Sequence, residues 1–408
     1  MYEFAVIWDW LAFGVRWLHV ITGIAWIGSS FYFVALDLGL KKVPDLPPGA
    51  YGEEWQVHGG GFYHIQKYLV APERMPDHLV WFKWESYVTW LSGFAMLCIV
   101  YYAGANIFLV DRGVADLPVW GAIVISLLSL SVGWLAYDNL CKSRLASRPT
   151  LLMVLLFCIL VVMAYGYTHI FSGRAALLHL GAFTATIMTA NVFFVIMPNQ
   201  RIVVADLKAG RTPDPKYGRI AKLRSTHNNY LTLPVLFLML SNHYPLAFAT
   251  EWNWLIASLV FLMGVTIRHY FNTMHATGKG PNWTWAATAI IFIVIMWLSS
   301  SPMSQRPELA MSPMDQKFAE APGFAQVADV IRGRCGMCHT SEPFWPGIHR
   351  APKDVVFETD QEIAVHAREI YLQAGRSHAM PPGNVSEIEP SERKQIVDWY
   401  RAAIGGDA

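Results

Sequence analysis

The decisive stretch of this chain is Cys335-Gly336-Met337-Cys338-His339. Two thiols three positions apart, followed at once by an imidazole, have the spacing that attaches a c-type haem. The sulfurs can add to the haem vinyl groups, and His339 then lies under the iron as its proximal ligand. Met380 is the candidate sixth ligand, because a thioether favours electron transfer over oxygen chemistry. A zinc half-site is the alternative, but zinc needs further paired ligands, and the chain has no other cysteine pair.

Helical patterns surround this motif. Apolar residues recur at helical spacing from 324 to 334, Thr359 and Glu362 form a capping box that opens a second helix, and a third helix follows Pro390. Three helices and a Met-Pro-Pro loop resemble a short single-haem cytochrome c domain. We therefore expect this domain at 320–408 and a linker at 305–319, after a different unit at 1–304.

The unit at 1–304 has the composition of a membrane domain. The chain is 54% hydrophobic, with a mean hydropathy of +0.31, and its apolar runs are long enough to cross roughly 30 Å of hydrocarbon. The first run is too long for a cleaved signal peptide and lacks a basic n-region. A net charge of +1 gives no sign of nucleic-acid binding. The fold class is therefore all-α, an eight-helix transmembrane bundle followed by the cytochrome domain, with helices at 10–36, 83–104, 118–138, 151–168, 175–197, 229–243, 253–274 and 283–300.

Lysine and arginine counts set the orientation. The loops at 37–80, 139–150, 198–228 and 275–282 hold fifteen of these residues, whereas the N-terminus and the other three loops hold two. Because basic loops stay in the cytoplasm, the N-terminus lies outside, and eight crossings return the C-terminal domain to that face. We expect a multi-pass protein of the bacterial inner membrane, with the N-terminus and the cytochrome domain in the periplasm.

The two halves of the bundle share a weak pattern. Trp17-Leu18-His19 matches Leu177-Leu178-His179 at an offset of 160, which suggests two parallel four-helix repeats. Coincidence in an apolar alphabet is the alternative.

Ionisable residues inside a bilayer are costly and mark candidate functional sites. An outer set holds Arg16, His19 and His179, and an inner set holds Glu85, Asp138, Arg268 and His269. The alternative for each histidine is a structural hydrogen bond between helices.

A hairpin is predicted in the first long loop. Polar and apolar residues alternate on both sides of the run Gly59-Gly60-Gly61, a pattern typical of two paired strands. Three glycines let the backbone approach an anion, and His64, Gln66 and Lys67 follow them. This segment is a candidate cradle for a planar anionic heterocycle. The alternative is an amphipathic hairpin lying on the membrane surface.

The combination of motifs resembles a known family. The run from Trp17 to Gly28, the segment from Val57 to His64, the stretch Trp81-Phe82-Lys83-Trp84-Glu85 and the C-terminal haem motif are similar to the bacterial integral-membrane urate oxidases fused to cytochrome c. The resemblance covers essentially the whole chain. It implies oxidation of urate to 5-hydroxyisourate, without hydrogen peroxide. Electrons would pass through the c-type haem to a respiratory-chain acceptor, such as a soluble cytochrome c or a terminal oxidase.

Urate chemistry indicates which residues a site would use. Urate is a planar monoanion, so it needs a cation, an amide to read the ring edge, an aromatic surface and a base. The candidate catalytic residues of these types are His64, Gln66, Lys67, Glu85, Asp138, Arg268 and His269.

A second cofactor is implied by the distance across the bilayer. Electrons from an inner site would have to cross most of the membrane, so we expect an intermediate centre. His19 and His179 are the candidate ligands of a b-type haem, because the first helix is similar to small membrane haemoproteins that oxidise porphyrinogens. A substrate site in the outer half would need no such relay.

Other membrane redox relays are the alternative functions. They include oxidation of a quinol or porphyrinogen to cytochrome c and a cytochrome-bearing oxidase subunit. A mere membrane anchor for the cytochrome is disfavoured, because one helix is enough to anchor it.

Overall fold

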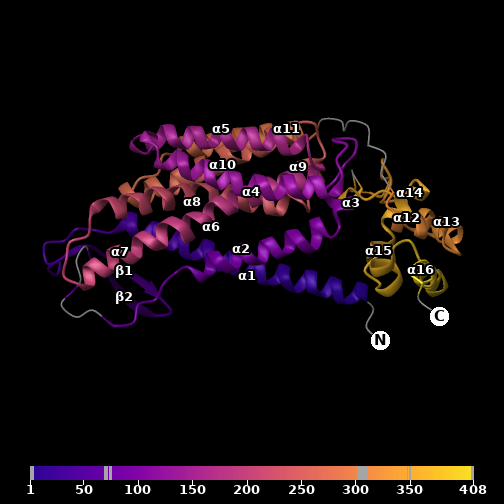
Figure 1. Ribbon diagram of the computed structural model, residues 1–408, viewed down its shortest axis with the longest axis horizontal. Coiled ribbons are helices and arrows are strands. Elements are labelled where there is room, and N and C mark those ends of the chain that lie inside the picture. The colour runs from indigo at the N-terminus through magenta and orange to yellow at the C-terminus, as the bar shows by residue number, and fades with distance from the viewer. Residues whose placement is uncertain are drawn as a thin grey trace.

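The protein forms a long helical bundle with a smaller helical domain at one end (Figure 1). A computed structural model describes residues 4–68, 72, 76–300, 311–346, 348 and 351–405. Within these residues the only paired strands form one hairpin. The expected all-α fold class is therefore consistent with the structure.

Each of the eight apolar ranges is helical. The bundle helices alternate in direction between two ends. We call the end that carries the C-terminal domain the docked end, and the opposite end the far end. The helices are α1 (Phe4–Gly39), α2 (Trp84–Met96) with η1 (Leu97–Tyr102), α4 (Val119–Lys142), α5 (Pro149–Thr168), α6 (Gly173–Ala190) with η3 (Asn191–Ile196) and α7 (Met197–Lys208), α8 (Pro215–Ser241), α10 (Asn253–Thr277) and α11 (Trp283–Ser299).

Among the described residues, five helices are long and apolar enough to cross a membrane, which makes the chain compatible with a membrane protein. These are α1, α4, α5, the continuous helix Gly173–Lys208 and α10, and α11 is a shorter apolar helix. The helix α8 differs because its first half carries buried polar side chains, among them Arg224 and Asn229. The helical part of that segment therefore begins at Pro215, earlier than hydropathy predicts.

The core of the bundle forms around α6, which packs against α4, α5 and α8. Two glycines allow close helix approach there. A Cβ on Gly133 would stand 1.9 Å from the Phe183 ring, and a Cβ on Gly264 would stand 2.5 Å from Pro234. Because Gly264 of α10 has no side chain, α10 leaves room for Pro234, the proline inside α8.

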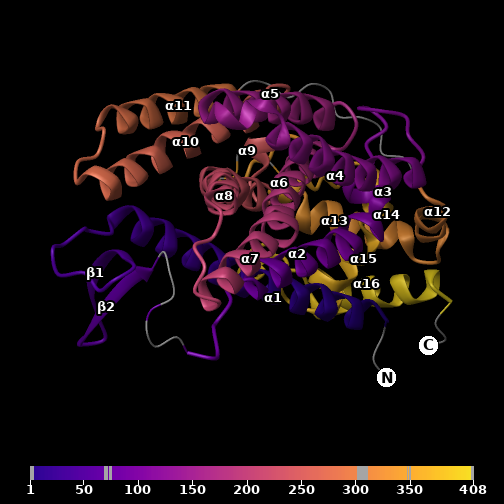
Figure 2. The ribbon, with the colours of Figure 1, turned by 60° about the vertical axis from the view of Figure 1, so that its left-hand side comes forward.

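Short elements complete the bundle. At the docked end lie α3 (Ala105–Phe108) and α9 (Pro245–Phe248), and η2 (Arg144–Ser147) connects α4 to α5. The predicted hairpin is confirmed as β1 (Ala50–His58) and β2 (Gly61–Tyr68), antiparallel with His58 opposite Gly61. Both turn residues, Gly59 and Gly60, have positive φ, as the tight primed turn requires. Figure 2 shows the hairpin beside the far end of α1.

The C-terminal domain has its own core. Its elements are α12 (Pro313–Glu320), α13 (Phe324–Cys335), η4 (Pro352–Asp354), α14 (Asp360–Val365), α15 (Ala367–Ile370), η5 (Tyr371–Arg376), η6 (Pro382–Asn384) and α16 (Pro390–Ala403). The helices predicted before Cys335 and after Pro390 are confirmed, as is the capping box of Thr359 and Glu362.

The predicted linker at 305–319 overlaps this domain. Residues 301–310 lie outside the described ranges. The helix α12, however, packs into the domain core, where the Trp399 indole donates a hydrogen bond to the Phe318 carbonyl at 2.9 Å.

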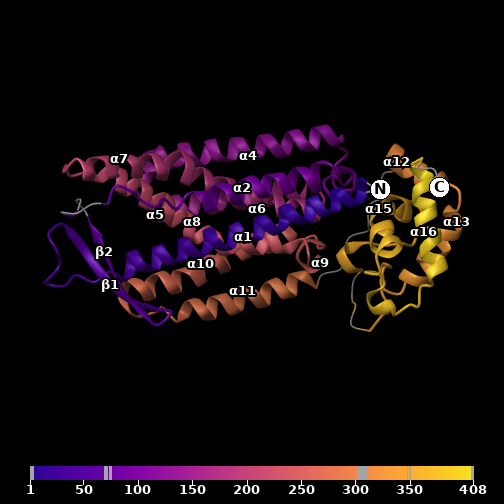
Figure 3. The ribbon, with the colours of Figure 1, turned by 90° about the horizontal axis from the view of Figure 1, so that it is seen from below.

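Both chain ends lie at the docked end (Figure 3). Arg368 of the C-terminal domain donates to the Ala5 carbonyl at 3.1 Å and lies 4.0 Å from the Asp9 carboxylate. From the bundle side, Arg174 donates to the Lys353 carbonyl. Each unit therefore contributes an arginine that binds a backbone carbonyl of the other unit.

Candidate functional site

The Cys-x-x-Cys-His motif forms one tight turn after α13. The amides of Cys338 and His339 both bond the Cys335 carbonyl, at 3.2 and 2.9 Å. His339 donates its Nδ1 proton to the Val355 carbonyl at 2.8 Å, which leaves Nε2 as the nitrogen available to a metal. Burial raises the pKa of the Cys335 thiol to about 12, so this sulfur is a neutral thiol near neutral pH. No group of three or more metal-binding side chains occurs among the described residues, which disfavours a zinc site.

Met380 lies in a loop that a buried arginine holds in place. Arg393 of α16 donates to the carbonyls of Ala374 and Met380 at 2.6 and 2.9 Å. Met380 and Cys335 pack against the same apolar cluster. A nitrogen ligand, a thioether and two thiols beside apolar surface are the donor set of a c-type haem. The residues present therefore fit this group.

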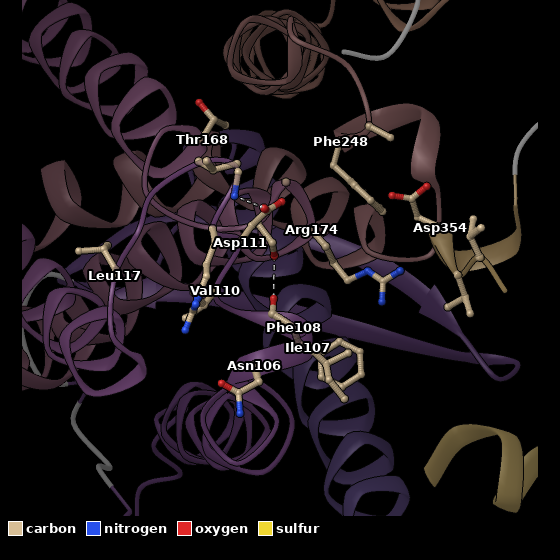
Figure 4. Close-up of a pocket in the computed structure, with 18 of the residues that line it drawn as sticks. Asn106, Ile107, Phe108, Val110, Asp111, Leu117, Thr168, Arg174, Phe248 and Asp354 are labelled. Carbon is tan, nitrogen blue, oxygen red and sulfur yellow. Dashed lines mark hydrogen bonds between the residues drawn. The ribbon is translucent and has the colours of Figure 1, made fainter. Parts of the chain in front are cut away.

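A cavity of about 650 Å³ lies between the C-terminal domain and the docked end of the bundle. Figure 4 shows the Arg174 guanidinium between the rings of Phe108 and Phe248, whose centroids lie 5.9 and 5.5 Å from it. Val355 lines the cavity, and its carbonyl is the one that binds His339. Val355 therefore connects the cavity to His339, the proposed iron ligand.

The two outer histidines have different surroundings. His19 donates from Nδ1 to the Thr89 carbonyl of α2 at 2.9 Å, and its ring lies against Gly93. His179 donates from Nδ1 to the Ala175 carbonyl at 2.7 Å. Its ring is fully buried against aromatic side chains, and Nε2 has no partner among the described residues. The helix α2 packs against both α1, which carries His19, and α6, which carries His179.

Asp138 is held in an ion-pair network at the far half of the bundle. Its carboxylate accepts from Arg224 of α8 at 2.6 Å and lies 2.6 Å from the Lys142 ammonium. Arg224 also donates to the Asn191 side chain at 3.1 Å. Both charges are compensated, so Asp138 acts as a structural partner of Arg224 here and is not a free base.

Arg268 is placed differently, because no described carboxylate pairs with it. The guanidinium is buried, stacks 4.0 Å above the Phe31 ring centre, and donates to the side-chain oxygens of Asn229 and Asn272 at 3.2 and 3.0 Å. The Asn229 side-chain nitrogen is also buried and has no described partner. An unpaired buried cation is unfavourable. This group of four residues is therefore suited to an anion.

The remaining predicted residues are not gathered around Arg268. His269 follows it on α10, with Nδ1 3.4 Å from the Tyr230 hydroxyl. In the hairpin, His64 binds Glu53 at 2.7 Å, Gln66 accepts from Tyr68 and Lys67 pairs with Asp37. Those hairpin groups already have partners within the chain. One Glu85 oxygen is buried without a described partner, near the far end of α2.

Sequence reasoning missed Arg224, Asn229, Asn272 and Phe31. The first two lie in the run Arg224-Ser225-Thr226-His227-Asn228-Asn229, most of which hydropathy assigns to a loop. The available signal was that this run continues the helical spacing of the apolar residues after it.

Comparison with known families gives one result. Residues 5–299 match the family described as urate oxidase N-terminal. Searches of curated proteins and of solved structures gave no match. Because the matched range covers well over half of the chain and the whole helical bundle, this protein belongs to the urate oxidase N-terminal family.

Proposed function

We propose that this protein oxidises urate to 5-hydroxyisourate and passes the electrons to a c-type haem on Cys335 and Cys338, with His339 and Met380 as iron ligands. Family membership supports the substrate, and the donor set of the C-terminal domain supports the acceptor. The bundle would span the bacterial inner membrane, with the N-terminus and the C-terminal domain in the periplasm. A soluble cytochrome c or a terminal oxidase would then receive the electrons.

The observation that carries the proposal is the buried guanidinium of Arg268 over Phe31, which no carboxylate of the described residues pairs. Burying a charge without a counter-ion is costly, and a bound monoanion would remove that cost. Urate is planar, so it can stack on an aromatic ring while it accepts hydrogen bonds from a guanidinium. The unpartnered Asn229 nitrogen supplies a further donor to a ring carbonyl.

The reaction needs one proton acceptor besides the electron acceptor. Urate monoanion and water give 5-hydroxyisourate, one proton and two electrons. We assign the proton to His269, the next residue of α10, whose Nδ1 lies 3.4 Å from the Tyr230 hydroxyl. A bound haem supplies a one-electron acceptor, so each urate reduces two haem equivalents.

Anaerobic addition of urate to the purified full-length protein tests the proposal. We expect the c-haem absorbance to change to the reduced form, with no hydrogen peroxide formed when air is admitted. If urate leaves the haem oxidised while a quinol or porphyrinogen reduces it, the proposed function is wrong.

An Arg268→Gln variant tests the site. Loss of a charged hydrogen-bond donor costs about 1.5–3 kcal/mol, so the urate concentration for half-maximal reduction should rise about tenfold to a hundredfold. The matched control is Arg211→Gln, because Arg211 is an exposed arginine paired with Asp206 at 2.7 Å. If the two variants need the same urate concentration for half-maximal reduction, Arg268 does not bind urate.

A further inference from the structure

A second cavity, of about 890 Å³, opens at the far half of the bundle between α5, α8 and α10. It begins at the N-terminus of α5, where Pro149 and Thr150 line it, and extends along α8 to Tyr230 and across to His269. Arg268 and Phe31 do not line it. It therefore meets the residues proposed for urate only at Tyr230 and His269.

Positive charge surrounds this cavity. Lys216, Arg219, Lys222 and Arg224 line it, and no aspartate or glutamate does. Arg224 is paired with Asp138, Lys216 with Asp214 and Lys222 with Asp37, whereas Arg219 is exposed and has no ion-pair partner among the described residues. The amide groups at the start of α5 add the positive end of a helix dipole. An anion is the ligand that this wall favours.

His227 supplies an independent sign of a ligand. The Tyr137 hydroxyl accepts from the Asn191 amide at 3.0 Å and bonds His227 Nδ1 at 2.7 Å, a bond to which we assign the hydroxyl proton. The remaining ring proton is therefore on Nε2. This nitrogen is buried without a described partner, on a residue that is 1% exposed and lines the cavity. A buried N–H donor without a partner costs about 1–3 kcal/mol, and a ligand oxygen would satisfy it.

The floor of the cavity is apolar. Met153, Ile220, Leu223 and Val265 line it beside the basic groups. Next to Met153 on α5, Leu151 and Val154 expose 38% and 51% of their surface. A small hydrophilic anion would leave this apolar surface unused. An amphiphile would cover the floor with its hydrocarbon and place its charge at the basic rim.

We propose that this cavity binds one anionic phospholipid, with its phosphate between Arg219 and the His227 Nε2–H group and an acyl chain along Met153 and Leu223. Basic pockets between helices at the cytoplasmic side of a membrane protein are suited to acidic headgroups. The position fits, because the far end carries the basic loops of the chain. None of these four lipid-contacting residues belongs to the set proposed for urate.

Lipid retention tests the proposal. The full-length protein is delipidated and then exchanged into vesicles of phosphatidylcholine, with or without phosphatidylglycerol. Bound lipid is counted by native mass spectrometry. We expect the wild type to retain phosphatidylglycerol in preference to phosphatidylcholine. The double variant Arg219→Gln/Lys222→Gln should lose about tenfold or more of that retention, because the charged contact of Arg219 and a neighbouring positive charge both disappear.

Two further variants separate the headgroup from the acyl chain and from general charge. Leu223→Trp fills the apolar floor while all charges stay, and it should lower retention as well. Arg211→Gln removes a cation outside the cavity and should have no effect. Retention that is equal in the wild type and the double variant would overturn the proposal.

Competition with small anions identifies the source of the charge. Inorganic phosphate and urate, added separately, should leave the bound phosphatidylglycerol in place. Displacement by either one would show a small-anion site and would overturn the lipid assignment. Haem reduction by urate is measured on the same variants, and we expect it unchanged in Arg219→Gln/Lys222→Gln. Failure of the lipid test therefore leaves the proposed function untouched.

Discussion

Replacing Asp138 by Asn should destabilise the bundle strongly, because it leaves a buried guanidinium without its counter-ion. The Arg224 side chain is 2% exposed and the Asp138 side chain 13%, and their charged atoms lie 2.6 Å apart. Removing one partner of a buried ion pair costs about 3–5 kcal/mol. At about 2 °C per kcal/mol for a unit of this size, the midpoint of thermal unfolding should fall by about 6–10 °C.

The reverse change should be milder. In Arg224→Met the Asp138 carboxylate keeps the Lys142 ammonium at 2.6 Å, a side chain that is 68% exposed. The remaining charge is thus still paired and close to solvent, so we expect a loss of about 1–3 kcal/mol. The double variant Asp138→Leu/Arg224→Met removes both charges and should lie within about 1 kcal/mol of the wild type.

The assay is thermal unfolding of the detergent-solubilised protein, followed by far-ultraviolet circular dichroism. The control is Asp206→Asn, which removes the exposed pair with Arg211 and should cost less than about 1 kcal/mol. The reasoning is refuted if Asp138→Asn behaves like Asp206→Asn. It is also refuted if the double variant is as unstable as Asp138→Asn alone.

Three other changes probe the C-terminal domain and the outer histidines. Burial lowers the pKa of His366 to about 4, below the 6.5 of an unfolded histidine. The unfolded state therefore binds the proton first, and stability should fall by up to about 3 kcal/mol as the pH drops from 6.5 to 4. His366→Gln should remove that acid sensitivity in urea unfolding. Met380→Ala should keep the covalent haem but lower its reduction potential, since the thioether is lost. An unchanged potential and spectrum would show that Met380 is not an iron ligand. Acidic acetone should extract a non-covalent haem from the wild type and much less from His19→Ala or His179→Ala, whereas purely covalent haem in the wild type would exclude the b-type haem.

The helices, the capping box and the hairpin turn could be predicted because each depends on local sequence. Long apolar runs form helices when no water is available to the backbone, and all eight ranges are helical. The capping box of Thr359 and Glu362 and the turn at Gly59 and Gly60 are also local signals, and both are confirmed.

The partners of the charged residues could not be predicted, because they come from distant segments. Asp138 and Arg224 are 86 positions apart, and hydropathy assigned Arg224 to a loop. The hairpin illustrates the same point. Its strands were predicted, but its side chains bind α1 and each other, through pairs such as Tyr32 with Gln56 and Asp37 with Lys67.

The length of α10 connects the urate position with the need for a second redox centre. Arg268 lies fifteen residues after Asn253, which lines the cavity beside the C-terminal domain. At 1.5 Å per residue this is about 22 Å, farther than one electron-tunnelling step covers at catalytic rates. His179 lies six residues, about 9 Å, from the docked end of α6, and its unpartnered Nε2 could bind a centre there. If extraction shows only covalent haem, urate must instead react in the outer half of the bundle, where Arg174 lies between the rings of Phe108 and Phe248 in the cavity beside Val355. In that case Arg174→Gln, and not Arg268→Gln, should abolish haem reduction by urate.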